Sequence, residues 1–489
     1  MITTPIDGKF KKEIRDEIDE KLHFEPGTLI SDTRKTDKGD LVKLAPDTGI
    51  LYNIGTGTGG ARIYAGIYCP DSRLDVQKVI EPCLPYASRQ NELVLLNEER
   101  KARSRTADDR VKYREKLKRI EGAPDKEGLI SRLKKEIRLT KPIRDKADLE
   151  EISGSIAPEK VVIKFLSKDI LAEDKKRTAS GESSMEDSLR NEFLITNCVR
   201  HGSVPRTIKF GECQEGIYFM ETFIYGKPLN ELNDKNENFW RTEGKKPLEF
   251  LPKKFVFAFL AKYYEGLAGI HKKRILLRDI KTKNIMVGFD GNIDIIDFGL
   301  ASKINENNSN ASFAGGYELY LPQEIITHIE EVFDSNGRKT AYRIKKGHSI
   351  LATPKSDVHS SGVLTCKLMS GKFPFTADKF ATLQDIIANG KHPDPRKLNY
   401  ESGYDGDDIK YLVDMTMNTD PEKRLSAEEL AYHARKRLEK IGYTSATNVI
   451  TEFMKPLKEK INETFQKPLS EVPSTPDFDD DTPSIKVKS

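Results

Sequence analysis

Cysteine and long apolar runs are both scarce in this chain. The five cysteines are scattered without metal-ligand spacing, so we expect reduced thiols and neither a disulfide framework nor a zinc site. The longest apolar run, residues 255–261, is far too short to cross a bilayer. Residues 1–12 contain no apolar core flanked by basic residues, which predicts that no secretory signal is present. We therefore expect a soluble, cytoplasmic protein without a transmembrane segment.

A strong charge of one sign is also missing. The formal net charge is only +4 over 489 residues, although about a third of the residues are charged. Such a balance gives no argument for a nucleic-acid partner. The length is sufficient for two to four compact units, so one catalytic unit with additional elements fits comfortably.

The most informative pattern is a group of polar residues in the second half of the chain. Asp279, Lys281 and Asn284 lie within six residues, and Asp297-Phe298-Gly299 begins thirteen residues after Asn284. One carboxylate can orient a substrate hydroxyl, while the amide and the second carboxylate can hold metal ions on ATP. The alternative is that Asp279 and Asn284 merely shape a surface turn, but the ordered pair of motifs favours phosphoryl transfer.

In these motifs the chain resembles the eukaryotic-like serine/threonine protein kinases. The resemblance implies that Asp279 orients the hydroxyl and that Lys281 neutralises charge on the transferring phosphoryl group. It implies that Asn284 and Asp297 bind Mg²⁺, with Mn²⁺ as the alternative metal. Lysine two residues after the catalytic aspartate is typical of the serine/threonine class. Leu277 stands where the family usually has histidine, a change that removes no catalytic group.

Lys164 ends an apolar segment that resembles the strand carrying the ATP-binding lysine of the family. A lysine in a buried strand needs a carboxylate partner, because an unpaired buried charge is costly. Glu192, in the helix expected after this strand, is the partner we predict, and Glu186 is the alternative. In an isolated sequence, a lysine that reaches solvent from the strand end would be the simpler interpretation.

A glycine-rich turn lies between two strand-like segments, which favours a phosphate loop of the kinase type over a dinucleotide fingerprint. An ordinary hairpin turn is the alternative. Arg62 stands where the family has a small apolar residue over the adenine, and Ile63 takes this place if the loop carries one extra residue. By position, Met220 would guard the back of the pocket, and Glu221 to Phe223 would offer backbone hydrogen bonds to adenine. The predicted loop consists of Gly55, Thr56, Gly57, Thr58, Gly59 and Gly60.

Three later motifs resemble protein kinases rather than kinases of small molecules. Residues 320–324 resemble the Ala-Pro-Glu motif, residues 357–362 the Asp-x-Trp-x-x-Gly motif, and residues 420–424 the segment whose arginine pairs with the Ala-Pro-Glu glutamate. The resemblance implies an ion pair between Glu324 and Arg424, and a role for Asp357 in bracing the catalytic loop.

By the same resemblance, the segment from Leu300 to Leu321 corresponds to the activation segment of the family. Arg278 could receive a phosphate from Ser309 or Ser312, and a plain flexible loop is the equal alternative. Tyr317 lies near the position where serine/threonine kinases usually have a threonine that contacts the catalytic aspartate.

The expected fold class is α+β with two lobes. The small lobe has a five-stranded antiparallel sheet and one key helix, which Ser183 and Glu186 open by capping-box spacing and which extends to about residue 200. The large lobe is mainly helical, including most of residues 322–438. The expected divisions are a flexible N-terminal extension (1–45), the small lobe (46–225), the large lobe (226–438) and a C-terminal helix with a disordered acidic tail (439–489).

Two additions depart from the family pattern, at about 71–158 and 329–353. The first is charged, with helical patterning and a modest basic excess. A solvated helical face is the simple interpretation, and docking of a partner or dimerisation is the alternative. Such additions resemble the effector kinases that bacteria deliver into host cells.

The predicted function is ATP- and Mg²⁺-dependent transfer of the γ-phosphoryl group to serine or threonine hydroxyls of protein substrates, with autophosphorylation. The alternative is a pseudokinase that serves as a scaffold for partner proteins.

Overall fold

The computed structural model describes most of the two predicted lobes. The residues described are 24, 26–35, 41–56, 61–70, 75–84, 87, 158–178, 184–232, 251–304, 318–333, 339–346, 348, 350, 352–370, 373–375, 380–389 and 406–464. Several predictions concern residues outside these ranges: Gly57 to Gly60, most of the charged insertion, the sites Ser309, Ser312 and Tyr317, and the acidic tail.

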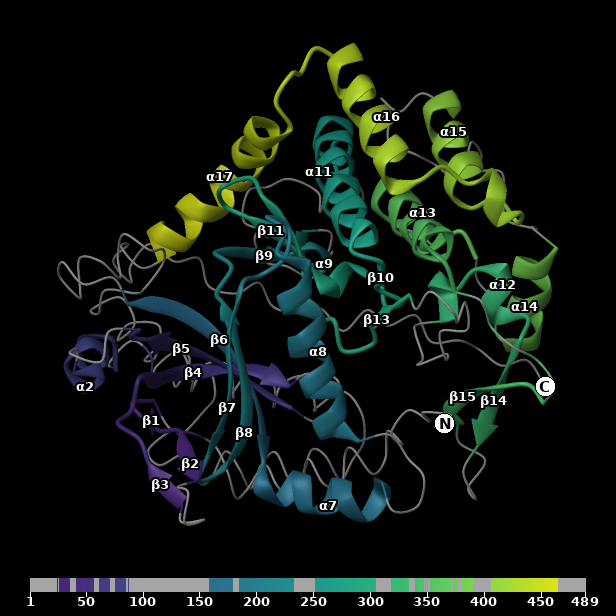
Figure 1. The fold of residues 1–489 in the computed structure, drawn as a ribbon. Helices are drawn as coiled ribbons and strands as arrows, with labels where there is room; N and C mark the ends of the chain where they lie inside the picture. The colour runs from purple at the N-terminus through teal and green to yellow at the C-terminus, as the bar shows by residue number, and fades with distance from the viewer. Residues whose placement is uncertain are drawn as a thin grey trace, which may run out of the picture.

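The first half of the chain forms an antiparallel sheet of six strands, not the five we expected. The strand order is β1-β4-β5-β6-β8-β7 (Figure 1). The predicted hairpin is confirmed, and so is the later apolar strand that carries Lys164, because β-branched and apolar residues dominate these segments. The strands are β1 (Leu29–Ile30), β4 (Thr48–Thr56), β5 (Arg62–Tyr68), β6 (Glu159–Ser167), β7 (Thr207–Cys213) and β8 (Gly216–Thr222).

The sixth strand comes from residues that we had assigned to a flexible extension. β1 pairs with β4 through Leu29 and Ile30. The Phe24 ring is buried 4.7 Å from the ring of Phe165. The carboxylate of Asp32 lies 3.0 Å from Lys209 Nζ in β7 and also accepts a hydrogen bond from the Tyr218 hydroxyl. The residues around β1 are therefore part of the sheet and its apolar core. The adjoining strands β2 (Thr33–Lys35) and β3 (Leu41–Lys43) pair with each other.

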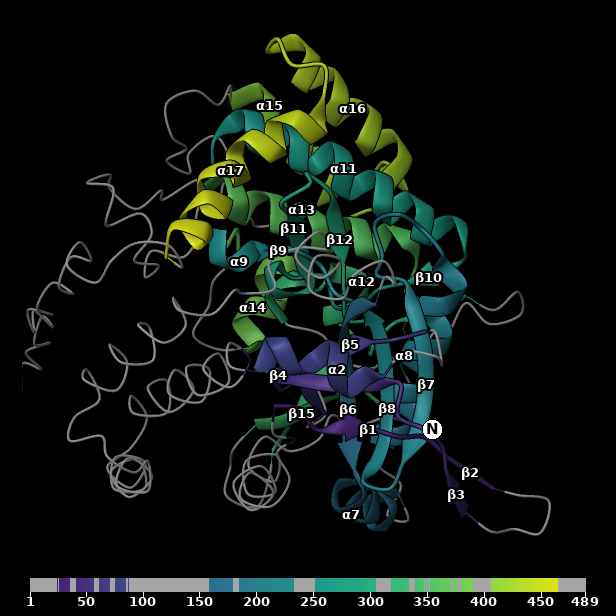
Figure 2. The same cartoon turned by 90° about the vertical axis from the view of Figure 1, so that its left-hand side faces the viewer.

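The helix α8 (Met185–Val199) packs on the sheet and carries the predicted glutamate. Its N-cap is Ser184, whose hydroxyl accepts a hydrogen bond from the Asp187 N–H, so the predicted cap at Ser183 with Glu186 was wrong by one residue. Met185 and Leu189 pack against Phe219 of β8 in one apolar cluster. Among the described residues of this half, the other helices are α2 (Val76–Ile80), which contacts β4 (Figure 2), η2 (Glu81–Cys83) and α7 (Lys168–Thr178).

The second half of the chain is mainly helical, as predicted, and is organised around α11 (Lys253–Lys272). Almost every apolar residue of α11 is buried, and α11 contacts both α16 and α17 (Figure 1). The other helices among the described residues are α9 (Leu229–Leu232), α12 (Gln323–Ile326), α13 (Pro354–Ser370), α14 (Phe380–Ala388), α15 (Gly406–Thr416), α16 (Ala427–Lys440), α17 (Ala446–Thr464), η3 (Thr282–Asn284), η4 (Glu318–Tyr320) and η6 (Pro421–Lys423).

The second half of the chain also contains short strands, which form small sheets of their own. β12, β11 and β9 form a three-stranded sheet, and β10 pairs with β13. The second addition contains an antiparallel hairpin, which is an exception to the expected helical pattern. The strands are β9 (Gly226–Pro228), β10 (Ile275–Leu276), β11 (Ile285–Gly288), β12 (Ile293–Ile295), β13 (Ser302–Lys303), β14 (Ile329–Phe333) and β15 (Lys339–Ile344).

The last helix, α17, was predicted and docks on the helical half. The rings of Phe453 and Phe255 lie 4.2 Å apart, and Ile450 and Met454 are fully buried. Gly291, with a φ of +83°, lets the turn after β11 approach α17, since an added Cβ would lie 2.5 Å from the Thr447 carbonyl oxygen. Within the described residues, no helix is long and apolar enough to span a membrane.

Candidate active site

The loop between β10 and η3 presents the central residues of the predicted site. Asp357, near the start of α13, holds this loop through hydrogen bonds to its backbone. Its carboxylate accepts the N–H groups of Leu277 at 2.9 Å and of Arg278 at 3.0 Å, and His271 Nε2 lies 3.0 Å from it. Asp357 therefore braces the loop as predicted, and His271 is an additional partner that sequence reasoning missed.

Asp279 lies in this loop, with only a small part of its surface exposed. Asp279 Oδ2 is 2.5 Å from Lys281 Nζ and 3.0 Å from Asn284 Nδ2. Asn284 Nδ2 also donates to the Asp279 carbonyl oxygen at 3.0 Å. Because the Asn284 amide nitrogen is used for these bonds, its oxygen is the atom left to meet a cation.

Asp297 follows β12 and faces the same cavity. Asp279, Lys281, Asn284 and Asp297 all line one pocket, together with apolar residues of β11 and β12. Arg278 and Asp297 have left-handed backbone angles, with φ of +63° and +66°. Such conformations are costly for residues other than glycine and cluster at functional sites. The fold therefore holds both ends of the site in an unusual geometry.

Lys164 is buried between two carboxylates from different elements. Its ammonium group contacts Glu192 Oε1 of α8, and it lies 3.3 Å from Glu221 Oε1 of β8. The Glu192 carboxylate also accepts the Phe298 N–H at 3.3 Å, which links α8 to the residue after Asp297. The predicted pair of Lys164 and Glu192 is confirmed. Glu186 instead pairs with Arg190 on the exposed face of α8.

The charges around Lys164 are unbalanced, since three carboxylates surround one ammonium group. Burial lowers the pKa of Lys164, but Glu192, Glu221 and Asp297 outweigh burial, so that the net pKa is raised. Burial raises the pKa of Glu192 to about 7, with further repulsion from Asp297 and Glu221 against the attraction of Lys164. The cluster therefore has excess negative charge, which a cation can balance.

The side chain that shares the sheet face of Lys164 is Glu221, not Met220. Lys164 lies opposite Phe219 in the β6–β8 pairing, and side chains alternate along a strand, so Glu221 shares the face of Lys164. Met220 packs on the other face of the sheet with Ile163 and Tyr64. The prediction for Met220 was therefore wrong, and strand alternation counted from Lys164 could have found Glu221.

The Phe223 backbone is also not free for the role we expected. Its N–H donates to the Lys160 carbonyl oxygen at 3.1 Å. The Phe223 ring lies 4.1 Å from Lys160 Nζ, as a cation–π contact. The first residues after β8 are therefore held to β6 at this point.

The described part of the glycine-rich loop consists of Gly55 and Thr56. Gly55 has a φ of +153° and donates its N–H to Asn53 Oδ1 at 2.7 Å. Ile63 lies opposite Lys164 and shares its face, whereas Arg62 lies opposite Phe165. The strand register thus supports Ile63, not Arg62, as the apolar residue beside the site.

The residues present suit a magnesium ion. Carboxylate and amide oxygens are the ligands that Mg²⁺ prefers, and Mg²⁺ is usually held by one or two carboxylates together with substrate phosphates. Asp297 and the Asn284 amide oxygen provide this kind of donor set. Among the described residues, no group of three or more His, Cys, Asp or Glu could hold a metal ion by itself.

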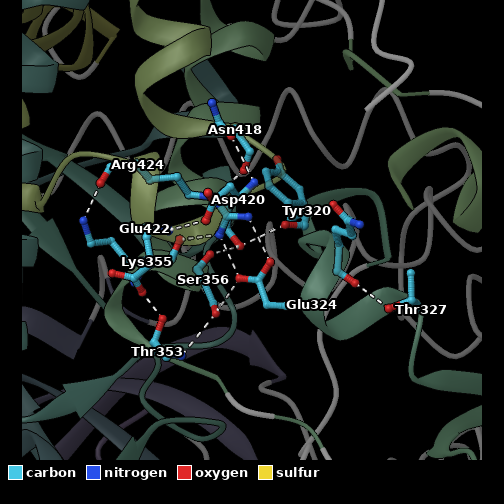
Figure 3. Close-up of polar contacts among 12 residues, drawn as sticks. Tyr320, Glu324, Thr327, Thr353, Lys355, Ser356, Asn418, Asp420, Glu422 and Arg424 are labelled. Carbon is cyan, nitrogen blue, oxygen red and sulfur yellow. Dashed lines mark hydrogen bonds and ion pairs between the residues drawn. The ribbon is translucent and has the colours of Figure 1, made fainter. Parts of the chain in front are cut away.

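The predicted ion pair between Glu324 and Arg424 lies on the helical side of the molecule (Figure 3). Arg424 Nη1 is 2.7 Å from Glu324 Oε1, and Nη2 is 2.9 Å from Oε2. Ser356 Oγ donates to the same glutamate at 2.9 Å. This cluster ties α12 to the start of α13 and to the turn before α16.

Comparison with known proteins agrees with this geometry. The model of the protein kinase domain matches residues 156–434. The strands β1, β4 and β5 and the helix α17 lie outside the matched range.

Several curated serine/threonine kinases are similar to part of the chain. One from Emericella nidulans, named serine/threonine-protein kinase ste20, is 23% identical over 51% of this chain and 25% of its own length. Another from Candida albicans, serine/threonine-protein kinase CST20, is 30% identical over 34% of this chain and 12% of its own length. A probable serine/threonine protein kinase from Arabidopsis thaliana, IRE4, is 27% identical over 49% of this chain and 22% of its own length. The chain therefore spans a quarter or less of the length of these relatives.

Proposed function

The chain belongs to the protein kinase family, whose model matches more than half of it, and we propose that it transfers the γ-phosphoryl group of ATP to serine or threonine hydroxyls of proteins. The observation that carries this proposal is the meeting of Asp279, Asn284 and Asp297 around one pocket, next to the buried pair of Lys164 and Glu192. The names of the similar relatives support serine and threonine as acceptors.

Each residue has a role that its surroundings favour. Asp279 orients the acceptor hydroxyl and takes up its proton, and Lys281, in contact with Asp279, offsets negative charge on the phosphoryl group in transit. Lys164, held by Glu192, binds the ATP phosphates. Asn284 and Asp297 would hold Mg²⁺, which when bound neutralises charge on those phosphates.

The nucleotide base would lie between Ile63 and the segment after β8. Ile63 and Glu221 both share the sheet face of Lys164. Since the N–H groups of Phe223 and Thr222 donate to the carbonyl oxygens of Lys160 and Arg206, backbone hydrogen bonds to adenine would come from the Thr222 carbonyl group and from Ile224. The glycines from Gly55 to Gly60 would cover the phosphates. The phosphate acceptors include the protein itself, so that autophosphorylation accompanies substrate phosphorylation.

The test is a transfer assay with γ-labelled ATP, Mg²⁺ and a mixture of serine and threonine peptides. We expect labelled peptide from the unmodified protein and none from Asp279→Ala or Asp297→Ala. Glu186→Gln is the matched control, because it removes an exposed carboxylate of α8 and should keep full activity. ATP binding by a protein that transfers no label, with or without cell lysate, would favour a scaffold function instead.

A further inference from the structure

The helix α8 begins against a carboxylate that belongs to another helix. Asp174 lies in α7, and only 2% of its surface is exposed. Its two oxygens accept the Met185 N–H at 2.9 and 2.8 Å, and one of them accepts the Glu186 N–H at 3.2 Å. The Ser184 hydroxyl also donates to this carboxylate, at 2.9 Å. Asp174 is therefore bonded to three successive residues at the start of α8.

These bonds provide acceptors for the first turn of α8. The first N–H groups of a helix have no acceptor within the helix itself. The Ser184 hydroxyl accepts the Asp187 N–H at 3.1 Å, and Asp174 accepts the two N–H groups before it. A carboxylate at this end also interacts favourably with the helix dipole, and its hydrogen bonds are of the stronger, charge-assisted kind. The start of α8 is thus held by α7 as well as by its own N-cap.

α7 is in turn continuous with the strand that carries Lys164. β6 ends at Ser167, α7 begins at the next residue, and the Ser167 hydroxyl accepts the Ile170 N–H at 3.3 Å. Ile170 is buried in the same apolar cluster as Met185 and Leu189 of α8. α7 therefore connects the end of the lysine strand to the beginning of the glutamate helix (Figure 1).

The place of this first turn affects the distance between Glu192 and Lys164. Glu192 follows Met185 by two turns, or about 10 Å of helix. Because a helix is stiff over so short a length, a shift at its start moves Glu192 by a similar amount. Glu192 contacts Lys164 of β6 and also accepts the Phe298 N–H at 3.3 Å, so two short contacts depend on its position.

We propose that Asp174 is a positioning residue for phosphoryl transfer, whose carboxylate holds the start of α8 so that Glu192 meets Lys164. The proposal rests on the proposed kinase function and adds a residue that acts on the reaction only through α8. Asp174 is buried between α7 and α8, so the loss of its carboxylate should be transmitted to the nucleotide through Glu192.

The test is a double-mutant cycle between Asp174 and Glu192 in the transfer assay with γ-labelled ATP. We expect Asp174→Ala to lower kcat/KM for ATP by about a hundredfold, since small displacements of catalytic groups have effects of this size. The KM for the acceptor peptide should stay the same. In the Glu192→Gln background, the same change should cost less than about threefold, because the pair that Asp174 positions is already lost. A hundredfold loss in both backgrounds would overturn the proposal.

Two further variants separate positioning from a general loss of structure. Asp174→Asn keeps the size of the side chain and one acceptor oxygen, so it should retain more activity than Asp174→Ala. Asp169→Ala is the matched control: it removes an exposed carboxylate of the same helix and should keep the full kcat/KM. All variants are compared well below their melting temperatures, measured by circular dichroism. Equal losses in Asp169→Ala and Asp174→Ala would contradict the role of Asp174.

Hydrogen exchange separates this proposal from the proposed function, because it needs no phosphoryl transfer. Loss of Asp174 should speed the exchange of the N–H groups of residues 185–187, and also of the Phe298 N–H, which depends on the position of Glu192. If no peptide is ever phosphorylated but both regions exchange faster in Asp174→Ala, the kinase activity fails and the positioning role stands. Faster exchange at 185–187 alone, with Phe298 unchanged, would show that Asp174 is only a local cap and would overturn the proposal.

Discussion

Arg424 and Glu324, one hundred residues apart in the chain, form a two-pronged ion pair in which both terminal nitrogens of the guanidinium meet both carboxylate oxygens. The Arg424 side chain is fully buried, and its remaining donors bind the carbonyl oxygens of Asn418 at 2.7 Å and Lys355 at 2.9 Å. A planar guanidinium suits this geometry, which a lysine could not reproduce. The pair thus fixes α12 relative to the start of α13.

Removing one partner of this pair should strongly destabilise the protein. We expect Arg424→Ala to lower the free energy of unfolding by about 3 kcal/mol or more, since a partly buried carboxylate and several carbonyl groups lose their donor. Urea unfolding measures the change. Arg435→Ala is the matched control: its contact with Glu265 is 3.6 Å long and exposed, so its loss should cost less than about 1 kcal/mol. Equal effects of the two variants would show that the pair at Glu324 has no special role.

The contribution of the same pair should depend on pH in a defined direction. Burial raises the pKa of Glu324, but the hydrogen bonds and the charge of Arg424 outweigh burial, so that the folded-state pKa lies below its ordinary value. A lowered folded-state pKa gives stability that is fully present above the unfolded pKa of glutamate, about 4, and is lost as the pH falls through the lower folded value. The difference between the unmodified protein and Arg424→Ala should therefore shrink in acid, as unfolding at pH 7 and pH 3 would reveal.

Glu221 should influence the pH at which Glu192 ionises and forms its ion pair with Lys164. Because the pKa of Glu192 is raised to about 7, we expect kcat/KM for ATP to rise as the pH increases through neutrality and Glu192 ionises. Glu221 is one cause of this raised pKa, so Glu221→Gln should move the rise to lower pH. Glu212→Gln, an exposed change in β7, is the control and should leave the profile in place. A profile that does not move in Glu221→Gln would contradict this role.

Asp357 should affect the rate rather than nucleotide affinity. Its replacement by alanine leaves the N–H groups of Leu277 and Arg278 without their acceptor, so the loop that carries Asp279 is no longer held in one conformation. We expect kcat to fall about a hundredfold with little change in KM for ATP, as small displacements of catalytic groups have this effect. Asp357→Asn keeps one acceptor oxygen and should retain more activity. Similar kcat values for both variants and the unmodified protein would refute the bracing role.

The two proposed metal ligands should differ from other polar residues in their response to Mg²⁺. Asp297→Asn and Asn284→Ala should each lower kcat by about a thousandfold at ordinary Mg²⁺, and part of the loss from Asn284→Ala should be recovered at high Mg²⁺. A Mg²⁺ titration of the transfer rate makes the comparison. Asp290→Asn, in the turn after β11, is the control and should show the Mg²⁺ dependence of the unmodified protein.

The N-terminal segment should be essential for the stability of the sheet. Phe24 packs 4.7 Å from Phe165 and 5.4 Å from Tyr64, so Phe24→Ala should cost about 3 kcal/mol by leaving a cavity in this aromatic cluster. Thermal unfolding measures the loss. A melting temperature unchanged by the substitution would indicate that this segment is only loosely attached.

The parts of the fold that were predictable are those with a local pattern or a charge that needs a partner. Val161 to Phe165 could be assigned to a strand because apolar β-branched residues dominate it, and Lys164 within this strand required a carboxylate. That requirement, combined with the order of the motifs, correctly identified Glu192, although it lies 28 residues away.

The missed features lack such a local signal. β1 has only two residues, and its pairing with β4 depends on tertiary contacts around Phe24 and Asp32 that no short window contains. Ser183 and Ser184 are adjacent, so the capping pattern fitted either. Glu221 was predicted only for its backbone, and the contact of its side chain with Lys164 was missed. The pairing of β8 with β6 decides which face of the sheet a side chain occupies, and a short motif does not contain this information.

The first insertion leaves and re-enters the sheet at one place. Tyr68, the last residue of β5, lies opposite Glu159, the first residue of β6, so the two ends are neighbours whatever chain connects them. Since the entropy cost of closing a loop grows only with the logarithm of its length, the sheet is almost indifferent to how many residues are placed there. The connection between β5 and β6 therefore tolerates large changes in length: a foreign domain or a fluorescent reporter could replace residues 88–157 while the strands on either side keep their register.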